Sequence, residues 1–244
     1  IVSMKSIRTQ MISLIVIVCV IVFFGLNYSI EQKLNELKNH TITQYLDITE
    51  SRANEVSKEL VGIINQVRMV SKSTIIQSMD LNIIKDYLKS LIEDSNIRSM
   101  TISDINGKAW TTYDSDIDIS KQEQFKSIII DQKEWIISNP FHSPYFFEDI
   151  PIITISHQIK VNDEIVGLLN AVVTTEFMNK ITESIQFKNL SFAWIIDSNG
   201  KIVSHPNKSI SIDQSYNNIL QYEGSNPFTN NSGSFNYLDE NNRS

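Results

Sequence analysis

The feature that most constrains this chain is an apolar run that no charge interrupts. Residues 11–28 read MISLIVIVCVIVFFGLNY, and only Ser13, Gly25 and Asn27 depart from the apolar character. A helix of this run would be about 27 Å long, close to the thickness of the hydrocarbon core of a bilayer. The run therefore predicts a transmembrane helix.

The charges that flank the run predict its orientation. Lys5 and Arg8 precede it, no acidic residue does, and Glu31 follows it. Basic residues are retained on the cytoplasmic side of a membrane. We therefore expect residues 1–10 in the cytoplasm and residues 29–244 outside the cell (plasma) membrane, with a single crossing.

Two alternatives for the run remain open. A cleaved signal peptide would have an apolar core of about 7–15 residues that ends at a small-x-small site. The run is longer and continues through Phe23, Phe24 and Tyr28 without such a site. A core helix of a globular domain is disfavoured because the run has no polar face.

Composition excludes several other classes of protein. Hydrophobic residues make up 41% of the chain and charged residues 20%, which is typical of a globular protein and not of a disordered one. Cys19 is the single cysteine, so neither an intrachain disulfide nor a cysteine-based metal site can form. The net charge of −7 and the lack of a basic patch give no indication of nucleic-acid binding.

Residues 29–79 are predicted to form one long stalk helix, continuous with the membrane helix. Apolar residues recur there at steps of three, four or their multiples, the spacing of one helix face. They are Ile30, Leu34, Leu37, Ile48, Val56, Leu60, Ile63, Val67 and Val70. Such a helix could carry a displacement to the membrane and hold two copies together as a homodimer. A plain coiled-coil stalk fits the same spacing.

Residues 80–190 predict a membrane-distal unit of α+β class with a PAS-like antiparallel sheet. Asp80 caps the first helix, and Asn106-Gly107 marks a hairpin turn. We expect helices at 81–93, 121–131 and 175–186, strands at 97–103, 108–113, 134–138, 151–160 and 164–174, and a solvated acidic loop at 114–120.

Residues 191–244 predict a second, membrane-proximal PAS-like unit that is incomplete. Its strands are expected at 192–197, 201–206 and 232–238, with a short helix at 213–220. The fold class expected for the chain is therefore α+β, with a transmembrane helix and a stalk helix followed by tandem antiparallel-sheet units.

Three stretches, in this order and spacing, carry a resemblance to a known family. They are MTISDINGKAWTTY (100–113), ISNPFHS with PIITISHQIKVNDEIVGLLNAVV (137–143 and 151–173), and FAWIIDSNGKIVSHPN (192–207). They resemble the double Cache ectodomains of bacterial chemoreceptors, sensor histidine kinases and diguanylate cyclases.

The resemblance implies sensing of a small molecule outside the cell and signalling across the membrane. A methyl-accepting chemotaxis protein is the output we expect first, with a diguanylate cyclase or a sensor histidine kinase as alternatives. A membrane-anchored protein-interaction module without a small ligand is a further alternative.

The resemblance also implies a ligand site in the distal unit, between its sheet and the loops near the short helix. By position the candidates are Tyr113, Phe125, Trp135, Ser138, Phe141, His142, Tyr145, Thr154, Ser156 and Asn170. Aromatic walls with a few polar groups suit a small-molecule pocket.

Three substitutions lead us to expect a ligand other than a typical amino acid. Family members that bind amino acids carry an arginine and an aromatic pair on the short helix and an aspartate on the last strand. Gln122 and Gln124 stand at the arginine and first aromatic positions, and Val172 stands at the aspartate position.

Motifs for catalysis and metal binding are missing from the sequence. It contains no His-Glu-x-x-His, no glycine-rich phosphate loop and no G-x-S-x-G. Its histidines are scattered, and Asp114, Asp116 and Asp118 lack the glycine and glutamate of a calcium loop. We therefore expect no enzymatic activity in this chain, no cofactor and no metal.

Overall fold

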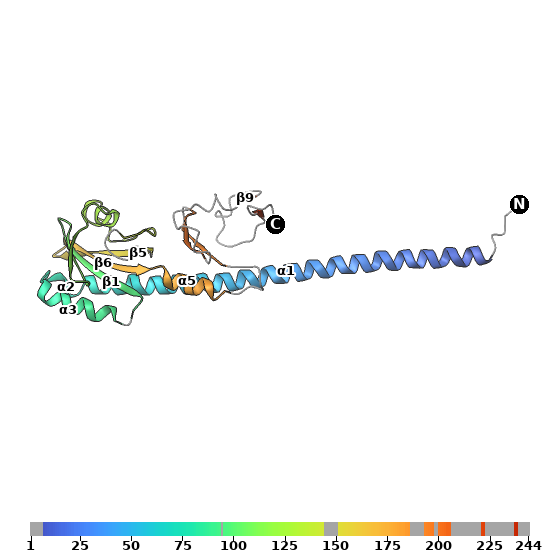
Figure 1. Cartoon of the computed structure of the whole chain (residues 1–244), viewed down its shortest axis with the longest axis horizontal. Coiled ribbons are helices and arrows are strands. Elements are labelled where there is room, and N and C mark those ends of the chain that lie inside the picture. Colours follow the sequence, from blue (N-terminus) through green and yellow to red (C-terminus); the bar gives the residue numbers. More distant parts are fainter. Residues whose placement is uncertain are drawn as a thin grey trace. The chain divides into compact units, whose positions relative to one another are not determined.

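The computed structural model describes residues 7–93, 95–143, 151–185, 193–197, 200–205, 221–222 and 237–238. The chain divides into two compact units, one formed mainly by residues up to Thr49 and one that begins at Glu50. Figure 1 labels some of the helices and strands. In chain order they are α1 (Ile7–Ser71), α2 (Thr74–Gln77), α3 (Leu81–Ile92), β1 (Ile97–Asp104), β2 (Lys108–Thr111), β3 (Ser115–Asp118), α4 (Glu123–Phe125), the π-helix η1 (Lys126–Ile130), β4 (Trp135–Ile137), β5 (Ile152–Val161), β6 (Glu164–Thr174), α5 (Glu176–Glu183), β7 (Ile195–Ile196), β8 (Ile202–Ser204), β9 (Gln221–Tyr222) and β10 (Tyr237–Leu238).

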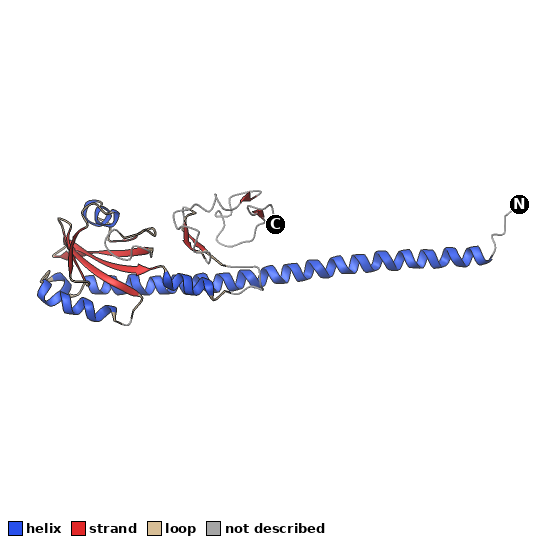
Figure 2. Ribbon diagram, in the orientation of Figure 1, coloured by secondary structure: helices blue, strands red, loops and turns tan. Residues whose placement is uncertain are grey.

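The predicted membrane and stalk helices form one continuous helix, α1, coloured with the other helices in Figure 2. Its most apolar 18-residue window has a mean hydropathy of 2.6, and none of that window is buried. α1 therefore contains a segment long and apolar enough to cross a membrane. The helix ends at Ser71, earlier than the expected residue 79, because Ser73 caps the separate helix α2 by accepting a hydrogen bond from Ile76 N.

An antiparallel sheet of six strands forms the centre of the second unit. The strand order is β3-β2-β1-β6-β5-β4, so the long strands β1, β6 and β5 lie in the middle. This confirms the predicted α+β class with a PAS-like sheet. Asn162 and Asp163 join β5 to β6, and both have positive φ, as a two-residue turn with the twist of a hairpin requires.

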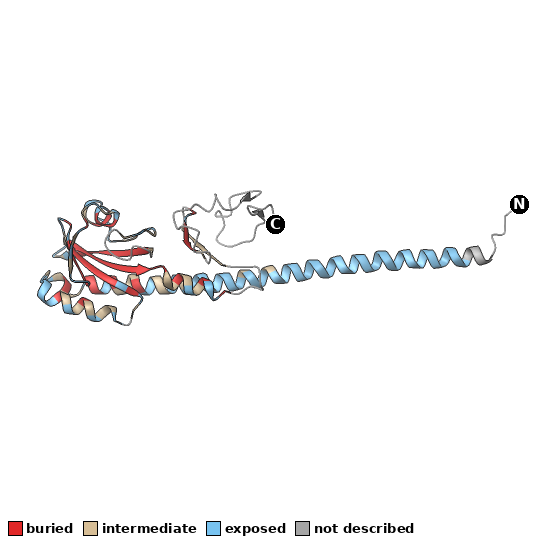
Figure 3. Ribbon diagram, viewed as in Figure 1, coloured by how far each residue is buried: buried red, intermediate tan, exposed pale blue. Residues whose placement is uncertain are grey.

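The two faces of this sheet are covered differently. The apolar face packs against the C-terminal part of α1 and against α3, in a cluster that includes Val67, Leu88, Ile155 and Leu169. The other face is covered by α4 and η1, through a smaller cluster that includes Phe125. Figure 3 shows the buried residues concentrated in the sheet and in the parts of the helices next to it.

Residues 114–120, expected as a solvated loop, contain the edge strand β3. Ser115 and Ile117 are half-buried while Asp116 and Asp118 are exposed, so the segment alternates between two faces as a strand does. Charged side chains on the outside of an edge strand discourage pairing with another chain. The acidic spacing that indicated a loop is thus the outer face of an edge strand.

The second predicted unit is described in part. β7 pairs with β8 and β9 pairs with β10, both antiparallel. The oxygens of the Thr182 and Ser204 hydroxyls lie 3.0 Å apart, which joins the end of α5 to β8. The helix expected at 213–220 lies outside the described residues.

Two glycine substitutions should have opposite effects on stability. A Cβ on Gly167 in β6 would lie 2.1 Å from the backbone oxygen of Ser103, whereas one on Gly62 in α1 would meet nothing within 4 Å. We expect Gly167→Ala to lower the free energy of unfolding by about 1–3 kcal/mol, because two central strands must separate. Gly62→Ala should raise it by roughly 0.5–1 kcal/mol, because alanine favours the helix.

Chemical denaturation of the whole chain in detergent measures both changes. Equal effects of the two substitutions would contradict the close approach of β1 and β6.

Candidate functional site

A small cavity with mostly apolar walls and a few polar side chains lies on the α4 side of the sheet. Strands β1, β2, β3, β5 and β6 contribute to it, together with the segments around residues 119–124 and 141–143. The described residues that line it are Ser99, Thr101, Thr111, Ile117, Ile119, Gln122, Gln124, Phe141, Ser143, Ile152, Thr154, Asn170 and Val172. None of them carries a charge, so the cavity offers hydroxyls, amides and apolar contacts.

Strand alternation explains why small polar side chains are buried here. On β5, Thr154 and Ser156 point to the cavity side, while the alternate residues Ile153 and Ile155 belong to the apolar cluster with α1. Ser156 Oγ donates a hydrogen bond of 2.8 Å to Asn170 Oδ1 on the neighbouring strand. Each polar side chain on this face therefore needs a polar partner, because an unpaired buried group is costly.

Thr154 is the exception among these side chains. Its hydroxyl oxygen is buried and has no hydrogen-bond partner within the part of the chain that the structure describes. The residue is only 1% exposed and lines the cavity. A bound polar ligand could supply the missing partner.

Three residues of the predicted site come together at this cavity: Phe141, Thr154 and Asn170. Two more lie directly behind its wall. Ser156 holds Asn170, and Ser138 Oγ accepts a hydrogen bond of 2.9 Å from Thr154 N.

The other predicted residues lie elsewhere. Phe125 is buried in the apolar cluster under α4 and η1. Trp135 and Tyr113 are 46% and 45% exposed, and Tyr113 donates a hydrogen bond to Arg98 O. Partial burial raises the pKa of Tyr113, and the nearby Arg98 charge opposes this rise. His142 is exposed, and Tyr145 lies outside the described residues.

Ser99, Thr101 and Thr111 line the cavity and were not among the predicted residues. A signal for the first two was present in the sequence. Small polar residues alternate on β1 with Met100 and Ile102, which are buried in the apolar cluster. Polar residues at every second position of a central strand indicate a buried polar face.

The cavity is small. Its volume is about 30 Å³, which is room for one or two water molecules. Gln124, itself buried, donates a hydrogen bond to the Gln122 side chain at the cavity wall. A ligand larger than water therefore requires the lining segments to move apart.

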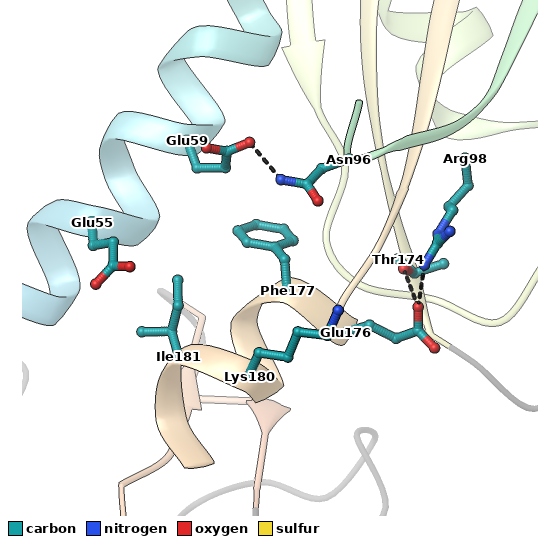
Figure 4. Close-up of a pocket in the computed structure, with 9 residues that line it drawn as sticks. All are labelled: Glu55, Glu59, Asn96, Arg98, Thr174, Glu176, Phe177, Lys180 and Ile181. Atoms are coloured by element: carbon teal, nitrogen blue, oxygen red, sulfur yellow. Dashed lines mark hydrogen bonds and ion pairs between the residues drawn. The ribbon is translucent and has the colours of Figure 1, made fainter. Parts of the chain in front are cut away.

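A second, larger groove of about 260 Å³ lies between α1, the start of β1 and α5, and is drawn in Figure 4. Asn96 donates a hydrogen bond of 2.6 Å to Glu59 of α1, and Arg98 pairs with Glu176 of α5 at 2.7 Å. Both side chains of the Arg98 pair are at least 40% exposed, so the pair contributes at most about 1 kcal/mol. At this groove an exposed hydrogen bond and an exposed ion pair therefore connect the sheet weakly to α1 and α5.

Removal of the Ser156 hydroxyl should cost stability at the cavity wall. Ser156→Ala leaves Asn170 Oδ1 buried without its donor, and we expect the free energy of unfolding to fall by about 1–3 kcal/mol. Ser90→Ala on the exposed side of α3 is the matched control and should change it by less than about 0.5 kcal/mol. Equal effects in denaturant titrations would rule out the Ser156–Asn170 pair.

Solved structures with the same fold come from bacterial chemoreceptors. The ligand-binding domain of the Pseudomonas aeruginosa PAO1 amino acid chemoreceptor PctB, in complex with L-Arg, is 17% identical, with a TM-score of 0.62 over 72% of this chain and 70% of that chain. The domain of PctC in complex with GABA is 16% identical, with a TM-score of 0.61 over 70% and 78% of the two chains. That of the Pseudomonas fluorescens chemoreceptor CtaA in complex with L-serine is 16% identical, with a TM-score of 0.58 over 75% and 76%.

These structures contradict the expectation that the ligand is not a typical amino acid. They place the chain among domains that were solved with amino acids bound. The expectation gave too much weight to the charged groups that are missing at Gln122, Gln124 and Val172. A side-chain amide donates through its nitrogen and accepts through its oxygen, so neutral residues can contact both a carboxylate and an ammonium group.

A search of curated protein sequences found no match to this chain. The family model of the Cache domain matches residues 34–240 of this chain. This match covers most of the chain and includes the sheet, the cavity and the C-terminal part of α1. The chain belongs to the Cache domain family.

Proposed function

We propose that this chain is the extracytoplasmic sensing region of a bacterial transmembrane receptor, and that its cavity binds an amino acid or a related small zwitterion. The main observation in support of this proposal is the lining of the cavity. The cavity is lined by apolar side chains with a few buried polar groups, and the hydroxyl of Thr154 has no hydrogen-bond partner within the described part of the chain. The ligands of the chemoreceptor domains with this fold support the class of ligand.

The neutral wall suits such a ligand through its amides and hydroxyls. The Asn170 and Gln124 side chains each carry donor and acceptor groups, while Phe141 and Val172 offer apolar surface for a side chain. The walls present no charge among the described residues, so they favour a ligand whose own charges sum to zero. Small and neutral amino acids are therefore expected to bind more tightly than basic or acidic ones.

A route from the cavity to α1 follows from the alternation of β5. Thr154 faces the cavity, and its neighbours Ile153 and Ile155 pack in the cluster that contains Val67 and Val70 of α1. A ligand of amino-acid size must displace parts of the wall of this small cavity, and β5 is one of them. The same strand then moves against α1, which carries the displacement toward the membrane.

Such a switch requires the ligand to bind the open state more tightly than the closed one. The cavity of about 30 Å³ is too small for a ligand of amino-acid size, so such a ligand binds the wider state preferentially. The ligand thereby stabilises the open packing.

We propose that the receptor controls chemotaxis, because the solved structures that share its fold are chemoreceptor domains. A diguanylate cyclase or histidine kinase output is the alternative. Swarm-plate or capillary responses to the ligand, compared with cellular cyclic-di-GMP levels, distinguish them.

Ligand binding is tested on the whole chain in detergent or nanodiscs with a panel of amino acids, GABA, dicarboxylates and sugars. A ligand at about 100 times its Kd should stabilise the fold by about 2.7 kcal/mol, which corresponds to a rise in Tm of roughly 5–10 °C. Asn170→Leu should weaken binding at least about tenfold, because its hydrogen-bonding groups are lost.

Asn106→Leu, on the exposed turn between β1 and β2, is the matched control and should bind as the unmodified chain does. If no amino acid or GABA raises the Tm, or if both leucine variants bind equally well, the proposed site is wrong.

We propose that α1 crosses the membrane with its N-terminus in the cytoplasm. Cys19 is the single cysteine, so a Cys19→Ser background allows labelling at chosen positions. In intact cells a membrane-impermeant maleimide should label Asn39→Cys, while Ser3→Cys should react only after permeabilisation. The reverse pattern would refute the orientation, and loss of residue 3 from the mature protein would indicate a cleaved signal peptide.

A further inference from the structure

A histidine is buried on the face of the sheet opposite the cavity. His157 follows Ser156 on β5 and points toward α1, as Ile155 and Ile159 do. It is 2% exposed. Its Nδ1 lies 2.8 Å from the backbone oxygen of Gln158 and 2.9 Å from Oγ of Ser71, the last residue of α1.

These contacts assign the proton of the neutral ring. A backbone carbonyl can only accept, so Nδ1 carries the hydrogen and donates it to Gln158 O. Nε2 then holds a lone pair. It has no hydrogen-bond partner within the described residues, although it is buried.

A carboxylate lies close to this unpaired nitrogen. Glu134 Oε1 lies 3.5 Å from His157 Nε2 and 3.3 Å from Nζ of Lys72, which follows the last residue of α1. In the neutral state two acceptors face each other, and the carboxylate pairs with Lys72. A proton on Nε2 would turn this mismatch into a charge-assisted hydrogen bond between His157 and Glu134.

The surroundings of the ring oppose that proton in part. Burial holds the pKa of His157 below its ordinary value; the Gln158 carbonyl and the Glu134 carboxylate act in the opposite direction, and the Lys72 charge adds to the lowering. The hydrogen bond from Lys72 is the main cause that lowers the pKa of Glu134. The cleft of about 620 Å³ beside these groups is also lined by Lys160 and Asp163, at the β5–β6 turn.

We propose that this chain has a second input, acidity, which acts at His157. In mild acid a proton from solvent binds Nε2, and Glu134 exchanges its partner from Lys72 to the imidazolium. Lys72 then faces a like charge and loses its carboxylate. The C-terminal end of α1 is held less firmly against β5, the strand that also forms part of the cavity wall.

The sign of the pH dependence follows from the burial of the ring. The folded state binds the proton of His157 less readily than the unfolded chain, whose histidines titrate at about pH 6.5. The stability that comes from the neutral ring is therefore present above about pH 6.5 and is lost as the pH falls toward the folded pKa. Glu134 is paired throughout this window, and its own contribution is lost only at lower pH, when the carboxyl is protonated.

The test is an NMR titration of the histidine ring signals of the whole chain in micelles between pH 4 and 8. The His157 signal, assigned by its loss in His157→Gln, should titrate below pH 6.5. Lys72→Gln should raise its midpoint and Glu134→Gln should lower it, each by about 0.2–0.7 pH units. Both substituted side chains are more than half exposed, so neither change disturbs the core.

His142→Gln, at an exposed position, is the matched control and should leave the His157 midpoint unchanged. If His157→Gln does not fold, single substitutions of the other three histidines assign the signal by elimination. A His157 ring that does not titrate above pH 4, or a midpoint that neither charge substitution moves, overturns the proposal.

The link to α1 has its own readout. Amide hydrogen exchange of residues 63–72, corrected for the intrinsic effect of pH, should speed up as the pH falls through the His157 midpoint. In His157→Gln this acceleration should be absent at every pH. In the variants that lack one of the other three histidines, it should be absent only above the His157 midpoint. Unchanged protection across the titration would refute the loosening of α1.

Discussion

The packing of the last turns of α1 against the apolar face of the sheet is the interaction on which the rest of the second unit depends. Ile63, Val67 and Val70 are at most 6% exposed there. Each such side chain contributes about 1.5–3 kcal/mol when it is fully buried. Without this contact the sheet would expose one apolar face, and a displacement of its strands would have no path to the helix that contains the candidate membrane segment.

One face of the sheet packs against α1 and the other lines the cavity, because strand residues alternate between the two faces. On β5 and β6 the residues toward α1 are aliphatic, apart from His157, and those toward the cavity include Thr154, Ser156 and Asn170. The aliphatic face is stabilised by burial alone, whereas each buried polar group must be paired. The cavity lies on this second face, and the buried hydroxyl of Thr154 there has no hydrogen-bond partner among the described residues.

The contacts between the sheet and the helices differ in strength: some are buried and apolar, and others are exposed ion pairs. The apolar cluster on α1 is extensive and deeply buried, so it contributes most of the stability of this contact. The exposed pairs Arg98–Glu176 and Lys72–Glu134 contribute little to stability, so they can break or exchange at small cost. The Arg98 pair connects β1 to α5, and the Lys72 pair connects the residue after α1 to the residue before β4.

The sequence by itself determined the apolar span, the long helix and the alternating strands, because length, charge and periodicity are local properties. It also indicated Phe141, Thr154 and Asn170 for the site through the family resemblance. It missed the edge strand with Asp116 and Asp118, whose acids indicated a loop, and it gave too much weight to Gln122 and Val172 in excluding amino acids. Only the tertiary structure decided which side chains meet, since the pairing of Ser156 with Asn170 and of His157 with Ser71 depends on strand register and on how α1 crosses the sheet.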